Sequence, residues 1–173
     1  MARCRAGEAH AWKQLYDANF AFVERICRRL GTPDGELDDL VQETFVVAFK
    51  KLGAFTDGRI TTWLYRIAAN VVSSRHRRRR IRSALLGLFS DPEPQLTRAA
   101  DKEYDAREAQ AAVAQVLERM APKKREVFAL FELDGMSGEE IAERVGCKVD
   151  TVWSRLHYAR QDFERIAKKR GLP

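Results

Sequence analysis

The amino-acid sequence predicts an all-α protein of two small helical domains joined by a flexible linker. Apolar residues recur at spacings of three and four along most of the 173-residue chain, which is the period of amphipathic helices. Alternation with period two, typical of strands, is almost absent. The stretch 83–102 contains one glycine, two prolines and only scattered leucines, a composition typical of a linker. We therefore expect domains at 1–82 and 103–173.

The charge of the chain indicates a polyanionic partner. Thirty-one Lys and Arg residues outnumber 25 Asp and Glu residues, giving a formal charge of +6 and a pI near 9.4. Apolar runs such as 45–49 are far shorter than the roughly 20 residues that cross a bilayer. The polar N-terminus lacks the apolar segment of a signal peptide, so we expect a cytoplasmic protein without membrane insertion.

Two helices are expected in the first part of the chain. The first carries its apolar stripe from Trp12 to Leu30 and ends near 31–33, where Gly and Pro disfavour continuation. The second is expected to begin near Glu36 or Asp38 and to bury the positions of its apolar stripe up to Leu52. Its opposite side carries Asp39, Gln42, Glu43, Val46 and Lys50.

A third helix is expected after the loop 53–59 and runs into a basic cluster at 75–82. Such a cluster can be a solvated helix face, a localisation signal or a nonspecific binding site for a polyanion. Polar and aromatic side chains precede it on the same helix, a combination that favours single-stranded DNA as a ligand. Trp63 fits the apolar stripe as a core anchor, which leaves Tyr65 and Arg66 as the more exposed candidates for base contact.

The second domain contains a predicted helix-turn-helix. The helical pattern resumes near Glu103 and breaks at Pro122 and at 134–135. The sequence 137–140 is a capping box, and Gly146 can adopt the left-handed conformation that lets the chain turn into another helix.

The last helix is expected to bury one stripe and to present an opposite face able to read a major groove. The buried stripe comprises Val149, Val152, Leu156, Ala159 and Phe163. The outward residues are Lys148, Thr151, Trp153, Ser154, Arg155, His157 and Arg160. A helical hairpin used only for packing is the alternative interpretation.

Three segments together resemble bacterial sigma factors of the extracytoplasmic-function (ECF) type. They read DLVQETF at 39–45, TWLYRIAAN at 62–70 and RRR at 77–79. The C-terminal segments EIAERVGC at 140–147 and TVWSRLHYAR at 151–160 are similar to the promoter-reading helix-turn-helix of that family. The resemblance covers the chain from about Trp12 to Phe163 and implies a sigma-2 domain followed by a sigma-4 domain.

The resemblance also implies partners and site residues. It nominates the residues that bind the beta-prime clamp helices of core RNA polymerase as Asp39, Gln42, Glu43 and Val46. It nominates the residues that bind the minus-10 promoter element as Phe55, Arg59, Thr62, Arg66, Asn70, Arg75, Arg77, Arg78 and Arg79. The outward face of the last helix would read the minus-35 element. A second polymerase contact at the beta flap and an anti-sigma factor complete the implied partners.

Two other classes of protein fit parts of the sequence. An operator-binding repressor or activator would use the helix-turn-helix as a dimer, but the basic helix and the segment 39–45 are not expected in such a protein. A nucleic-acid-processing enzyme would need a catalytic centre. His10, His76 and His157 lie on different predicted elements, and no carboxylate cluster or metal-ligand spacing accompanies them. We therefore expect no catalytic residue, metal or cofactor. Cys4, Cys27 and Cys147 are expected to be reduced thiols, because they are odd in number and widely separated.

Overall fold

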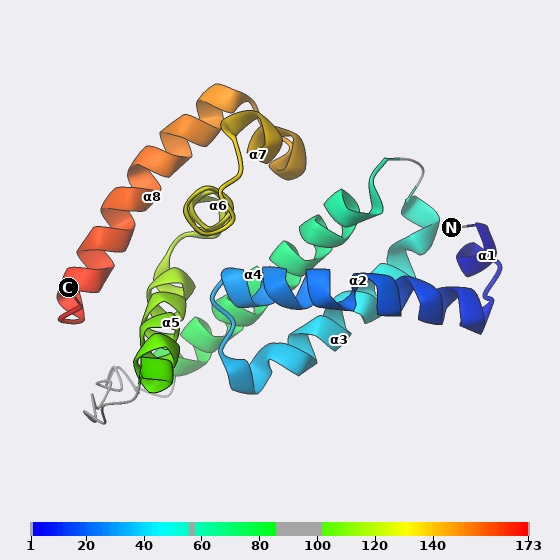
Figure 1. Ribbon diagram of the computed structural model, residues 1–173, viewed down its shortest axis with the longest axis horizontal. Helices are drawn as coiled ribbons and strands as arrows, with labels where there is room; N and C mark the ends of the chain where they lie inside the picture. Colours follow the sequence, from blue (N-terminus) through cyan, green and yellow to red (C-terminus); the bar gives the residue numbers. More distant parts are fainter. Residues whose placement is uncertain (1, 56–57, 86–101, 173) are drawn as a thin grey trace.

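The computed structural model describes residues 2–55, 58–85 and 102–172, and within these ranges it contains helices and turns but no strand (Figure 1). The all-α prediction is confirmed. In chain order the elements are α1 (Ala2–Arg5), α2 (Ala9–Arg29), α3 (Asp34–Lys51), the 3-10 turn η1 (Leu52–Ala54), α4 (Ile60–Leu85), α5 (Lys102–Arg119), α6 (Pro122–Phe128), the π-helical turn η2 (Ala129–Leu133), α7 (Gly138–Val145) and α8 (Val149–Lys169).

Helices α2, α3 and α4 pack against one another and form the first domain. Their shared core contains Val23, Leu40 and Leu64, which are completely buried. Helix α3 begins at Asp34, earlier than the sequence predicted. Pro33 takes the extended conformation of an N-cap, and acidic side chains in the first turn interact favourably with the positive end of the helix dipole.

The second domain comprises α5, α6, η2, α7 and α8. Pro122 begins α6 rather than only ending the preceding helix, because the first helical position needs no backbone N–H. The predicted capping box is present: Ser137 Oγ accepts from the backbone N–H of Glu140, and the Glu140 carboxylate accepts from the backbone N–H of Ser137. Gly146 ends α7 with φ of 78°, as the sequence predicted.

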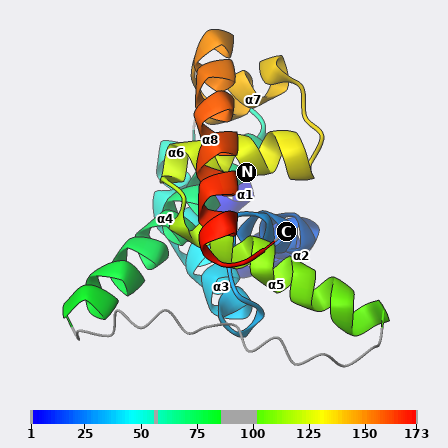
Figure 2. The same ribbon diagram turned by 90° about the vertical axis from the view of Figure 1, so that its left-hand side faces the viewer.

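The two domains pack against each other, which the sequence did not predict. Buried residues of α2, α3 and α4 form one continuous apolar cluster with buried residues of α6, η2, α7 and α8. The C-terminal end of α2 also approaches α5 closely: a Cβ on Gly31 would lie 2.8 Å from the carbonyl oxygen of Ala114. In Figure 2, α8 lies nearest the viewer and crosses over α6, with the first domain behind them, and it is α7 that contacts α4. Most of the expected linker lies outside the described residues.

Candidate nucleic-acid interface

The first part of the candidate interface lies on α4. Thr62, Arg66 and Asn70 follow one another at intervals of four residues, so they share one side of the helix. Arg66 and Asn70 are exposed, Thr62 is half-buried, and Arg59 is exposed just before the helix begins. This side of α4 therefore combines cationic, hydroxyl and amide groups able to contact a nucleic acid.

Phe55, by contrast, belongs to the core of the first domain. Its side chain is only 7% exposed, and its ring packs against Trp63 with the centroids 5.3 Å apart. Its carbonyl oxygen accepts a hydrogen bond from Arg5. The ring of Phe55 is therefore packed against Trp63 in the core rather than offered at the surface. The half-buried Trp63 matches the predicted core anchor.

Tyr65 was expected to be exposed, and this expectation is wrong. Its side chain is 1% exposed, and the guanidinium of Arg144 lies 5.7 Å from the ring centroid. Burial, together with the nearby Glu126 carboxylate, raises the pKa of the Tyr65 phenol well above its usual value. The sequence pattern of α4 could not reveal this burial, because the covering residues come from the other domain.

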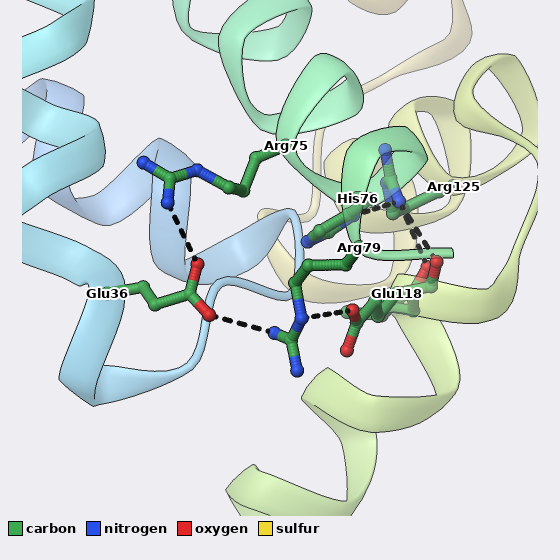
Figure 3. Close-up of polar contacts among 7 residues, drawn as sticks. Glu36, Arg75, His76, Arg79, Glu118 and Arg125 are labelled. Atoms are coloured by element: carbon green, nitrogen blue, oxygen red, sulfur yellow. Dashed lines mark hydrogen bonds and ion pairs between the residues drawn. The ribbon is translucent and has the colours of Figure 1, made fainter. Parts of the chain in front are cut away.

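In the basic cluster at the end of α4, some arginines form ion pairs with carboxylates and others extend into solvent. The guanidinium of Arg75 lies 3.7 Å from the Glu36 carboxylate and 3.5 Å from that of Glu43. Arg79 bridges Glu36 on α3 and Glu118 on α5 at 3.1 and 3.3 Å (Figure 3). Arg77 and Arg78 are exposed and extend the cationic surface of α4 beyond these ion pairs.

The second part of the candidate interface lies on α8, the last helix. Lys148, Ser154 and His157 are exposed, while Thr151 is half-buried. Val152, Leu156 and Ala159 are buried on the opposite side, as the periodicity predicted. The helix thus presents hydroxyl, imidazole and cationic groups while its apolar side holds it against α6 and α7.

Three of the residues nominated on α8 contact residues outside that helix, whereas His157 shares a hydrogen bond of 3.0 Å with Gln161 within it. The ring of Trp153 contacts Phe131 edge-on and also covers Gly138, where an added Cβ would lie 2.6 Å from it. Arg155 donates to the sulfur of Cys147, and Arg160 pairs with Glu132 at 2.7 Å. The Trp153 side chain is 44% exposed, so it both packs against α7 and borders the outward face of α8.

A third surface lies on α3. Asp39, Gln42 and Val46 are exposed, and Glu43 is half-buried beside Arg75. Phe49 was not singled out from the sequence, yet its side chain is 55% exposed and meets the edge of Trp12 at 5.1 Å. Phe49 lies three residues after Val46 and so shares its face of the helix, and this spacing was the signal in the sequence. Exposed apolar and polar groups together are typical of a protein-docking surface.

Among the described residues, no group of three or more His, Cys, Asp or Glu side chains is placed to hold a metal ion. Cys4 and Cys27 are buried free thiols, and burial raises the pKa of Cys27 to about 12. Within the same residues, no helix has the length and apolar character to cross a bilayer.

Comparison with known proteins identifies the class. The family model for sigma-70 region 2 matches residues 15–82, and the model for sigma-70 region 4 matches residues 110–163. The chain is 32% identical over 162 residues to the RNA polymerase sigma factor NccH of Alcaligenes xylosoxydans xylosoxydans, covering 91% of this chain and 87% of that protein. The chain belongs to the sigma-70 family of RNA polymerase sigma factors.

Further relatives narrow the class to the ECF group, so the protein is an alternative sigma factor that directs RNA polymerase to promoters. It is 32% identical to the ECF sigma factor SigE of Mycolicibacterium smegmatis, covering 92% of this chain and 62% of that protein. The solved structure of CnrH in complex with the cytosolic domain of CnrY superposes with a TM-score of 0.63 at 27% identity. That match covers 97% of this chain and 94% of CnrH.

Proposed function

We propose that the protein binds core RNA polymerase through α3, reads the minus-10 element with α4 and reads the minus-35 element with α8. It does no chemistry of its own, and the polymerase performs catalysis. The domains proposed for these tasks are 1–82 and 103–173, joined by 83–102. Family membership supports the overall activity, and the surfaces on α3, α4 and α8 supply the contacts.

The observation that carries this assignment is the separation of three exposed surfaces onto three helices. Asp39, Gln42 and Val46 lie on α3, whereas Arg66 and Asn70 lie on α4. The outward face of α8 belongs to the other domain. An operator-binding regulator needs only the last of these surfaces. A subunit that holds a polymerase and two separate DNA elements needs all three.

The proposed minus-10 residues are Arg59, Thr62, Arg66, Asn70, Arg75, Arg77, Arg78 and Arg79 on or beside α4, together with Phe55, which is buried against Trp63. Extruding a base from the duplex costs a few kcal/mol, which stacking and edge hydrogen bonds in a pocket can offset. The arginines toward the end of α4 would hold the phosphates of the adjacent duplex.

An anti-sigma factor is the third proposed partner. The solved relative CnrH was captured with CnrY, and the sigma factor RpoE of Bartonella quintana, 24% identical, was captured with the anti-sigma factor NepR. Val46 and Phe49 are exposed apolar side chains, and together they offer a protein partner an apolar surface to cover.

The deciding experiment is transcription in vitro with purified core polymerase on fragmented DNA from the native host, with every start site mapped. We expect defined starts that share two upstream elements. A protein that bound duplex sites as a dimer and left core polymerase inactive would instead be an operator-binding regulator.

A further inference from the structure

We propose that Trp153 of α8 determines specificity by covering the 5-methyl group of a thymine in the minus-35 element, and that Gly138 of α7 positions the indole ring for this contact. The inference rests on the proposed function of α8. It adds the chemical group that the helix selects, which the assignment of surfaces does not contain.

Trp153 lies where a base edge can be reached. It belongs to the second turn of α8, and residues near the start of a recognition helix are those that contact base edges in the major groove. Its side chain is 44% exposed, whereas the preceding Val152 is completely buried. Ser154, the next residue, is also exposed. The indole ring therefore borders the outward face of α8, beside a hydroxyl group able to form hydrogen bonds with a base.

The ring of Trp153 is held by contacts from two other elements. Phe131 of η2 meets it edge-on, with the ring centroids 5.6 Å apart and the planes at 76°. At the start of α7, a Cβ on Gly138 would lie 2.6 Å from Cζ2 of the indole and 3.0 Å from Cε2. An aromatic ring already fixed in this way loses little further conformational freedom when it contacts DNA.

Gly138 is needed for the ring rather than for the backbone. Its φ lies outside the left-handed region, so any residue could adopt this conformation. Glycine inside a helix is also less favourable than alanine. The space that a Cβ would occupy is filled by the indole of Trp153. An alanine at this position must therefore push the ring away from α7 and change where the ring meets the DNA.

Thymine is the base that matches an indole ring at this position. In the major groove thymine presents a 5-methyl group beside its O4 acceptor, whereas the other three bases present hydrogen-bonding groups. Indole offers an apolar surface and one N–H donor, and it has no acceptor. Covering one methyl group corresponds to a roughly fourfold gain in affinity.

The test uses holoenzyme reconstituted from the full chain and core polymerase. The probes are labelled duplexes that carry the minus-35 element of a start site mapped in the transcription experiment. In each probe one thymine is replaced by deoxyuridine, which lacks only the 5-methyl group. A second set compares cytosine with 5-methylcytosine at the same position, which adds the methyl group without the O4 acceptor. Fluorescence anisotropy gives the affinity for each probe.

Three variants separate reading from packing. W153A removes the ring, and G138A keeps the ring but displaces it. Y158A is the matched control, because Tyr158 is a 52% exposed aromatic residue of the same helix. Tyr158 lies five residues after Trp153, about 140° around the helix, and the ammonium of Lys124 lies 5.5 Å from its ring centroid. Circular dichroism checks that each variant is folded. If W153A is not folded, G138A/W153A replaces it, since the added Cβ fits once the ring is absent.

We expect one deoxyuridine position to weaken binding by the wild-type holoenzyme roughly fourfold. At that position 5-methylcytosine should bind more tightly than cytosine by a similar factor. W153A should bind the thymine and deoxyuridine probes equally, G138A should discriminate less than the wild type, and Y158A should keep the wild-type ratio. Each result is a ratio of two affinities of one protein, so a loss of stability or of general DNA affinity does not change it.

Several outcomes would overturn the proposal. A wild-type holoenzyme indifferent to every deoxyuridine would do so, as would a W153A variant that keeps the discrimination or a Y158A variant that loses it. A wild-type ratio in G138A would overturn the positioning role of Gly138. All of these leave the sigma-factor assignment intact. Failure of the proposed function would look different: no start sites sharing a minus-35 element would be found, and the reading by Trp153 would fall with it.

Discussion

Arg125 of α6 and Nδ1 of His76 on α4 share a hydrogen bond of 2.5 Å in the buried seam between the two domains. Burial lowers the pKa of Arg125 to about 10, so its guanidinium remains the donor at neutral pH. His76 must then accept through Nδ1 as a neutral imidazole. Burial, followed by the charges of Arg125, Arg79 and Arg80, lowers the pKa of His76 to about 3.

This pairing makes stability depend on pH. Unfolded His76 takes up a proton near its usual pKa of 6.5, whereas folded His76 does so only near 3. The contribution to stability is therefore complete above pH 6.5 and is lost as the pH falls from 6.5 toward 3. We expect the free energy of unfolding to fall by about 2 kcal/mol between pH 7 and pH 5 from this group.

Urea unfolding of the wild type and His76→Gln at the two pH values checks this expectation. Glu118 and Glu126 also have raised pKa values because of burial, and their titration has the opposite sign. Both proteins share those carboxyls, so the difference between them isolates His76. We expect the change in unfolding free energy between pH 7 and pH 5 to differ between the two proteins by about 2 kcal/mol, with the wild type losing more stability at pH 5. Identical profiles would show that the imidazole is not held neutral at the seam.

Gly31 tests the closeness of the two domains. It has φ of +84°, and an added Cβ would lie 2.8 Å from the carbonyl oxygen of Ala114 in the second domain. Gly7 is a matched control, because its φ of +79° imposes similar strain while an added Cβ would meet nothing within 4 Å. We expect Gly31→Ala to lower Tm clearly more than Gly7→Ala, whose cost is about 1 kcal/mol of backbone strain. Equal shifts would contradict the close packing of α2 against α5.

The sequence predicted the elements of each domain well, because their signals are local. The capping box at Ser137, the left-handed turn at Gly146 and the buried stripe through Val152 and Leu156 each depend on residues within one or two turns. The start of α3 and the role of Pro122 in α6 differed by small shifts at helix ends. Such shifts are expected where capping competes with periodicity.

The parts that the sequence did not predict depend on distant segments. Tyr65 has the pattern of an exposed residue on α4, but α7, about 75 residues later, covers it. His76 lies in a run of arginines, yet its side chain is 1% exposed because Arg125 packs against it. Helical periodicity describes one helix at a time and contains no information about which face the other domain will cover.

The capping box at the start of α7 should contribute measurably to stability. Ser137 Oγ accepts from the backbone N–H of Glu140 at 3.2 Å. Ser137→Ala removes this acceptor, and we expect a loss of about 1 kcal/mol. For a chain of this size, that loss lowers Tm by about 2–4 °C. Ser74→Ala, at an exposed position inside α4, is the control and should leave Tm unchanged or slightly raised.

The cationic end of α4 should contribute to DNA affinity through phosphate contacts. Arg77 and Arg78 are exposed, and each phosphate contact releases condensed counterions, which gives log affinity against log salt a slope of about −0.9 per contact on duplex DNA. We expect the double variant Arg77→Ala/Arg78→Ala to make this slope shallower by about 1.8. Titration of labelled duplex DNA at several NaCl concentrations measures it.

The control for this titration removes the same charge elsewhere. Lys168→Ala/Lys169→Ala lies in the exposed last turn of α8 and should leave the slope close to that of the wild type. Net charge alone would weaken binding equally in both double variants, because long-range attraction depends on total charge. A slope that changed only in the α4 variant would locate the phosphates at this helix. Equal changes would mean that α4 attracts DNA without contacting it.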